Sequence, residues 1–287
     1  MQSSLMKSLS FGAAALIVSA IPALADGMPR RKAAAVERDP CTYTANTAIT
    51  TEYVFRGFSQ SAGAPAVQGG FDATCGTFYA GVWASSIDFG KIPTVANDGV
   101  AKVEMDWYAG WKPVTGPVTW DLGVIYYTYP SASRLQNNGL RGDLNYVELK
   151  AGGSFAPWKD ATLGQTIFFS PDYQVSSGTA WTFETAFSQN LPKVGIFSPS
   201  VSALYGFQQG SDTANYRGTF GNGKDSYSYW NAGLTLGFRE KWSLDFRYWD
   251  TSVPNNNAGA PNGGNNFCKG DIFQCDQRYI ATLKFAL

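Results

Sequence analysis

Apolar and polar residues alternate along most of the chain, and residues 101–111 show the pattern most clearly. Every second position there carries an apolar residue: Val103, Met105, Trp107, Ala109 and Trp111. The positions between them begin with charged residues, Lys102, Glu104 and Asp106. Successive side chains of a β-strand point to opposite faces, so the segment predicts a strand with one apolar and one charged face. At helical spacing the two sets would mix, because Glu104 and Trp107 would share a side.

The same alternation predicts twelve strands. They lie at residues 44–59, 66–74, 77–89, 101–111, 118–129, 144–155, 161–169, 179–189, 199–208, 225–237, 242–251 and 277–287. In several of them, one set of positions holds large aromatic residues and the opposite set holds small or charged residues. In residues 242–248, for example, Trp242, Phe246 and Tyr248 oppose Asp245 and Arg247.

The connections between these strands alternate in length. The odd-numbered connections are mostly long and rich in Asn, Gly and Ser: 60–65, 90–100, 130–143, 170–178, 209–224 and 252–276. The even-numbered connections are mostly short: 75–76, 112–117, 156–160, 190–198 and 238–241. Short periplasmic turns and long extracellular loops are typical of outer-membrane barrels. The pattern therefore predicts an all-β, antiparallel transmembrane β-barrel of about twelve strands.

The start of the chain bears on which face of the barrel is apolar. A soluble barrel keeps its apolar face inside, whereas a membrane barrel turns that face to lipid and its polar face to the lumen. Lys7, the apolar run 9–20 and the Ala23-Leu24-Ala25 cleavage motif predict a signal peptide at 1–25. We expect a short periplasmic leader at 26–42 and the barrel at 43–287. Export favours the membrane barrel, in the outer membrane of a Gram-negative bacterium.

Aromatic residues and the end of the chain favour the same arrangement. Several aromatic residues fall near predicted strand ends, where membrane barrels carry aromatic girdles: Trp111, Trp120, Trp158, Trp242, Tyr129 and Trp249. The last predicted strand places Tyr279, Leu283, Phe285 and Leu287 on one face. This ending resembles the signal by which the barrel-assembly machinery recognises its substrates, so we expect that machinery and outer-membrane lipid as partners.

Composition narrows the function. Charged residues make up 15% of the chain, below the roughly 25% of a soluble domain. Removing residues 1–25 removes one Lys and no acid, which leaves 21 basic and 22 acidic residues, a net charge of −1. This charge gives no reason to expect nucleic acid as a partner. The sequence contains no His, which argues against an outer-membrane hydrolase that uses His as general base.

The four Cys residues of an exported chain predict disulfides rather than a metal site or a catalytic thiol. Cys41 precedes the first strand and Cys75 lies in the first short turn, so both should be at the periplasmic end. Cys268 and Cys275 share the last long connection. We predict the pairs Cys41–Cys75 and Cys268–Cys275, which staple loose ends of the barrel. The repeated Asn and Asp residues of the long connections match no calcium motif and predict solvated loops, and no cofactor is expected.

The polar face supplies the candidate site. A charge on the lipid face would cost roughly 2–4 kcal/mol near the midplane, so the charged set should point into the lumen. The predicted pore-lining residues are Glu52, Arg56, Asp72, Lys102, Glu104, Asp106, Asp121, Glu148, Lys150, Glu184, Asp245, Arg247 and Arg278. Opposed acidic and basic walls would orient polar solutes in an open pore. The same residues could instead form cross-strand ion pairs that fill a narrow interior.

Arg56 is a candidate for a constriction. Residues four apart along one strand lie about 13 Å from each other, so an acid on a neighbouring strand is a better partner for Arg56 than Glu52 is.

The first third of the mature chain resembles a known family. The resemblance rests on residues 51–60, Thr-Glu-Tyr-Val-Phe-Arg-Gly-Phe-Ser-Gln, on 65–72 and on 78–89, with weaker matches at 104–110 and 126–130. These residues resemble the TorF-type porin family of Gram-negative outer-membrane proteins. The resemblance implies a porin-like barrel and carries over no site residue.

We therefore expect a non-enzymatic channel for passive diffusion of small polar solutes or ions. The alternative is a structural or surface-interaction barrel with a packed lumen. The sequence leaves open the solute and whether the barrel forms a homo-oligomer.

Overall fold

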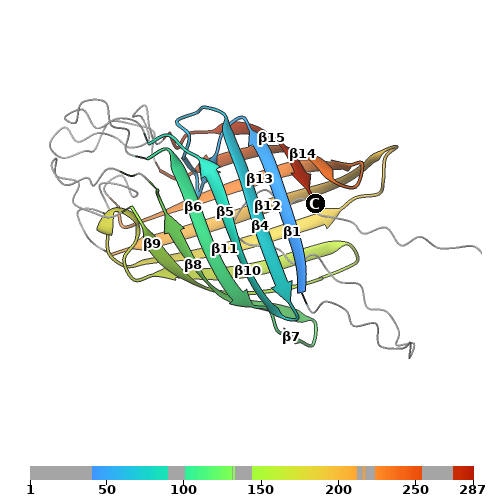
Figure 1. Cartoon of the computed structure of the whole chain (residues 1–287), viewed down its shortest axis with the longest axis horizontal. Helices are drawn as coiled ribbons and strands as arrows, with labels where there is room; N and C mark the ends of the chain where they lie inside the picture. Colours follow the sequence, from blue (N-terminus) through green and yellow to red (C-terminus); the bar gives the residue numbers. More distant parts are fainter. Residues whose placement is uncertain are drawn as a thin grey trace, which may run out of the picture.

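A computed structural model describes residues 41–89, 101–130, 132, 144–211, 216, 224–253 and 274–287. Twelve long strands wind around one interior (Figure 1). They are β1 (Cys41–Thr50), β4 (Ala66–Cys75), β5 (Phe78–Ser86), β6 (Val103–Trp111), β8 (Val118–Thr128), β9 (Tyr146–Phe155), β10 (Ala161–Ser170), β11 (Ala180–Asn190), β12 (Phe197–Gly210), β13 (Ser226–Phe238), β14 (Trp242–Thr251) and β15 (Arg278–Ala286). Shorter elements are β2 (Val54–Phe55), β3 (Phe58–Ser59), β7 (Val114–Thr115) and the 3₁₀ turn η1 (Gln174–Ser176).

The sheet closes on itself. Each long strand pairs with the next along the chain in antiparallel fashion, β7 being a short addition beside β8. The last strand, β15, pairs with the first, from Asn46 opposite Ala286 to Thr50 opposite Thr282. Closure leaves no unpaired edge among these strands. The predicted all-β, antiparallel barrel of twelve strands is confirmed.

The period of two separates the two faces of the wall. On β6, Trp107 is 51% exposed on the outside, whereas its neighbour Asp106 is 0% exposed on the inside. Apolar residues of the other strands are likewise exposed, among them Leu122, Leu149 and Phe246. The outer face of the barrel is therefore apolar and its inner face is polar, as the export signal, the connections and the aromatic residues predict.

The connections also follow the prediction. In an antiparallel barrel, alternate connections lie at the same end. The connections at one end span residues 51–65, 87–102, 129–145, 171–179, 211–225 and 252–277, and those at the other end span 76–77, 112–117, 156–160, 191–196 and 239–241. Among the described residues, no helix is long and apolar enough to cross a membrane, a finding that does not bear on crossing by strands.

Two sequence predictions about the wall are wrong in part. The first strand ends at Thr50 rather than at residue 59, because residues 51–65 leave the wall and fold inward. Trp111, Trp120, Trp158 and Trp242 are exposed as a girdle requires, but Tyr129 and Trp249 are buried. Trp249 shares the inward face of β14 with the buried Arg247, which explains its position.

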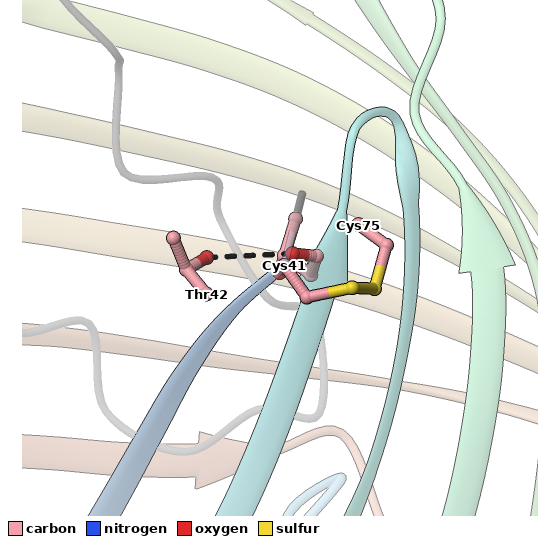
Figure 2. The surroundings of a disulfide bond; sticks show 4 residues. Cys41, Thr42 and Cys75 are labelled. Atoms are coloured by element: carbon pink, nitrogen blue, oxygen red, sulfur yellow. Dashed lines mark hydrogen bonds between the residues drawn. A yellow bond between two sulfur atoms is a disulfide. The ribbon is translucent and has the colours of Figure 1, made fainter. Parts of the chain in front are cut away.

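The predicted Cys41–Cys75 disulfide is present and joins the start of β1 to the end of β4 (Figure 2). The two residues face each other in the β1–β4 register, so the bond fastens the corner where the barrel begins. Cys275 is also disulfide-bonded. Cys268, its predicted partner, lies outside the described residues, as do the predicted signal peptide and nearly all of the predicted leader.

Replacing both Cys41 and Cys75 with Ser should lower the free energy of unfolding by up to about 4 kcal/mol, because the bond removes chain entropy from the unfolded state. The loop that it closes joins residues 34 positions apart. Urea unfolding in detergent micelles measures the change. The matched control is the pair Thr42→Ser and Thr74→Ser, which neighbours the disulfide in the same register. An unchanged urea midpoint would mean that the β1–β4 hydrogen bonds alone keep these strand ends together.

Candidate functional site

The inward loop, residues 51–65, carries a small hairpin into the barrel. β2 pairs with β3, Val54 opposite Ser59 and Phe55 opposite Phe58. Arg56 and Gly57 form the turn, with φ of 48° and 86°. A two-residue hairpin turn with both φ values positive is of the I′ type, for which Gly at the second position is favoured. Residues 56–61 are all buried, so the hairpin is enclosed by the barrel.

The tip of this hairpin reaches the far wall. The inward loop connects β1 to β4, which are adjacent in the wall. Arg56 contacts Glu148 on β9, Phe168 on β10 and Glu184 on β11. Around a closed ring of twelve strands, β10 lies six strands from β1 in either direction. The hairpin therefore crosses the whole interior.

The Arg56 guanidinium is held by charge and by aromatic faces. Its Nη1 and Nη2 atoms donate to the two carboxylate oxygens of Glu148 at 2.7 and 2.9 Å. Its Nε lies 3.9 Å from Oε1 of Glu184. The rings of Phe55 and Phe168 lie 4.8 and 5.0 Å from its central carbon. Bidentate, buried pairs of this kind are strong and have a specific geometry.

Two tyrosines orient the acids that receive Arg56. The Tyr127 hydroxyl donates to Glu148 at 3.0 Å, and the Tyr229 hydroxyl donates to Glu184 at 2.5 Å. The inward loop is also fastened at its base, where Arg278 lies 3.2 Å from Glu52. Gly57 lies so close to the wall that an added Cβ would be 2.2 Å from a methyl carbon of Thr251.

Aromatic side chains fill the barrel interior around the hairpin. Tyr127 stacks on Tyr146 with ring centres 4.3 Å apart, and Tyr146 meets the edge of Tyr173 at 4.8 Å. Tyr173 lies in the β10–β11 connection, where burial raises the pKa of its phenol. The phenol stays protonated and interacts with Arg56 and Gln208.

A second polar network lies on the inner wall nearer the short turns. Asp121 accepts from Lys150 at 2.8 Å and from Tyr79 at 2.7 Å, with Lys112 at 3.9 Å. A cavity of about 50 Å³ adjoins this network. Its lining includes Asp121, Gly152, Ser154, Thr162, Thr166 and Ser188.

A third network stays within the wall. Arg247 on β14 pairs with Asp245 at 2.9 Å and donates to Asn231 at 2.7 Å and to Ser202 at 2.9 Å. These partners belong to β12, β13 and β14, so this arginine braces neighbouring strands and does not hold the inward loop.

The structure encloses most of the thirteen predicted pore-lining residues. The buried ones are Glu52, Arg56, Glu104, Asp106, Glu148, Lys150, Glu184, Asp245 and Arg247, and the half-buried ones are Asp72, Asp121 and Arg278. Lys102 differs, because it precedes β6 and pairs at the exposed rim with Asp88 at 2.7 Å. Glu52 and Arg56 lie on the inward loop, not on a wall strand as expected. Whether the enclosed residues line a conducting pore stays a prediction.

Arg56 pairs with an acid other than Glu52, as the sequence predicts, but that acid lies on the far wall and not on a neighbouring strand. Sequence reasoning missed the tyrosines that serve those acids, because it treated aromatic residues as the outward set. Alternation along each strand could have identified them. Tyr127 has the same parity as Asp121, and Tyr229 has the same parity as Asn231, so both tyrosines face the interior.

Residues 34–274 match a family described as a bacterial protein of unknown function, Gcw_chp. The chain belongs to the Gcw_chp family. The resemblance to TorF-type porins stays a prediction. A search of the curated proteins finds no match to the sequence.

Solved structures similar to this Gcw_chp protein include porins. A KdgM porin is 6% identical, with a TM-score of 0.49, and the alignment covers 84% of this chain and 98% of the porin. A NanC porin is 8% identical, with a TM-score of 0.49 and coverage of 85% and 98%. LpxR from Salmonella typhimurium is 8% identical, with a TM-score of 0.41 and coverage of 85% and 99%. At these TM-scores, the similarities support no inference about activity.

Arg56→Met should destabilise the protein by about 3–5 kcal/mol, because it leaves the buried Glu148 carboxylate without its partner. The double variant Arg56→Met with Glu148→Met removes both charges and should recover much of that loss. Urea unfolding in micelles measures both changes. Lys102→Met, at the exposed Lys102–Asp88 pair, is the control and should cost less than about 1 kcal/mol. A double variant no more stable than Arg56→Met would contradict the paired geometry.

Proposed function

We propose that this Gcw_chp protein is an outer-membrane, porin-like channel for small polar solutes or ions, held constricted by the inward loop. The observation that carries the proposal is the hairpin that crosses the interior and docks through Arg56 on Glu148. A constriction made by a loop, rather than by the wall, can differ in position from one state to another while the barrel stays intact. The proposal includes outer-membrane lipid as the solvent of the apolar outer face.

The chemistry of the inner wall supports this proposal. Buried ion pairs are often no more stabilising than apolar residues of similar volume, so stability alone does not explain a charged interior. Here the interior holds the Arg56–Glu148, Lys150–Asp121 and Arg247–Asp245 pairs. A polar interior of this kind is expected where water or polar solutes pass.

One observation favours the alternative, a structural or surface-interaction barrel with a packed lumen. Tyr127, Tyr146, Tyr173 and Phe168 pack together around the hairpin and are buried. If this packing is permanent, the barrel does not conduct, and the extracellular connections carry the function.

Conductance in a planar bilayer separates the two functions. We expect the refolded protein to show small, discrete openings, and Arg56→Ala to show larger ones because the hairpin loses its anchor on the far wall. Loss of a positive charge from the constriction should also shift the reversal potential toward cation preference. Arg247→Ala is the matched control: it removes another buried arginine, whose partners Asp245, Asn231 and Ser202 lie on the wall.

Deletion of residues 54–59 is a second variant that removes the hairpin itself. It should also enlarge the openings. A protein that inserts, changes its gel mobility on heating and stays electrically silent in the wild type and in all three variants would support the packed-lumen alternative.

The orientation in lipid predicts a depth-dependent cost for a charge on the outer face. Val124 lies in the middle of β8, and Leu191 lies just after β11 in a short connection, and both are 39% exposed. Val124→Arg should destabilise the protein in lipid vesicles by about 2–4 kcal/mol, and Leu191→Arg by about 0–1 kcal/mol. Urea unfolding in vesicles measures both values. Equal costs for the two variants would argue against a lipid-facing wall.

A further inference from the structure

The carboxylate of Asp106 is fully buried and has no hydrogen-bond partner among the described residues. Asp106 is 0% exposed on β6, and its side chain faces the interior. Neither carboxylate oxygen has a hydrogen-bond partner within the described part of the chain. No ion pair in that part involves Asp106. An isolated buried carboxylate is costly, so a compensating group is expected beside it.

The groups that flank Asp106 are aromatic. Across the two strand pairings of β6, Asp106 lies opposite Trp83 on β5 and Tyr127 on β8. Trp83 is buried, and its indole N–H also has no partner among the described residues. The Tyr127 hydroxyl is used by Glu148, so it does not serve Asp106.

A second acid shares this part of the wall. Glu104 is two residues from Asp106 on the same face of β6, about 7 Å along the strand. Its Oε1 accepts from Tyr53 of the inward loop at 2.8 Å, and Tyr53 packs edge-on against Trp83 with ring centres 5.3 Å apart. The inward loop therefore contacts Glu104 and packs against Trp83, which lies opposite Asp106. Other buried acids of the interior, such as Glu148, Asp245 and Glu52, have a basic partner, whereas no ion pair in the described part includes Glu104.

The donor set indicates which cation would fit. Calcium and similar hard cations take six or more oxygen ligands, and no group of three or more His, Cys, Asp or Glu in the described part could hold a metal ion. A carboxylate between aromatic side chains instead matches a protonated amine, which donates N–H to the carboxylate and is attracted by aromatic faces. We propose that Asp106 and Glu104, with Trp83 and Tyr127, bind the ammonium group of an organic amine inside the barrel.

This proposal deepens the proposed function by naming a solute class, and it rests on that function for the route by which the amine reaches the interior. Binding is measured without conductance, by saturation transfer from the refolded protein in micelles to the methyl protons of methylammonium. We expect saturable transfer in the wild type and an affinity at least about tenfold lower in Asp106→Asn, which removes the charge and keeps the shape. Asp160→Asn makes the same change in the exposed β9–β10 turn, where Asn tolerates the φ of 64°, and should bind like the wild type.

Competition in the wild type tests the chemistry even if Asp106→Asn does not fold. A tenfold excess of sodium chloride should leave the transfer in place, because a buried pair is weakly screened. Transfer that is absent, that sodium abolishes or that a folded Asp106→Asn retains in full would overturn the amine site. If the protein binds methylammonium but never conducts, the amine site is supported and the channel function is contradicted. If the protein conducts but does not bind methylammonium, the channel function is supported and the amine site is contradicted.

Discussion

The guanidinium of Arg56 must be paired wherever it is buried, and Glu148 can serve it only if the inward loop crosses the barrel. A charge removed from water is stable only when its partner and its hydrogen bonds are complete. The bidentate contact with Glu148 and the rings of Phe55 and Phe168 meet that condition at one place on the far wall. The position of the hairpin and the aromatic packing around it depend on this contact.

Closure of the sheet makes such an interior possible. Once β15 pairs with β1, every second residue of each strand is enclosed, whatever its chemistry. Carboxylates that would be solvated on a soluble sheet are then forced to find partners across the lumen or along the wall. Asp245 has its partner along the wall, because Arg247 donates to it and also to side chains of the neighbouring strands β12 and β13. Glu148 has its partner across the lumen, because Arg56 lies on the inward loop.

Most of the wall could be predicted from the sequence, because its period of two is imposed locally on every strand. Strand number, the inward parity of Glu104 and Asp106, and the pairing of Cys41 with Cys75 all follow from that period and from the lengths of the connections. The inward loop could not be predicted, because residues 50–56 alternate as a wall strand does. Gly57 is the local sign of a turn, but the place that the turn reaches is set by Glu148, which is 92 residues from Arg56. Lys102 has the parity of the inward set, but it lies just before β6 begins, so its side chain is at the exposed rim.

In the proposed channel, the arginine that constricts the interior also neutralises it, which would link conduction to selectivity. With the hairpin in place, Arg56 compensates Glu148 and approaches Glu184, whereas Glu104 and Asp106 have no ion-pair partner among the described residues. If the hairpin leaves its site, all four carboxylates face one lumen without a cation from the loop, and Tyr53 no longer covers Glu104. A negative lumen attracts cations and repels anions. An open state of this barrel would therefore be more cation-selective than its constricted state, and the bond that closes the path would also set the charge of the path when it opens.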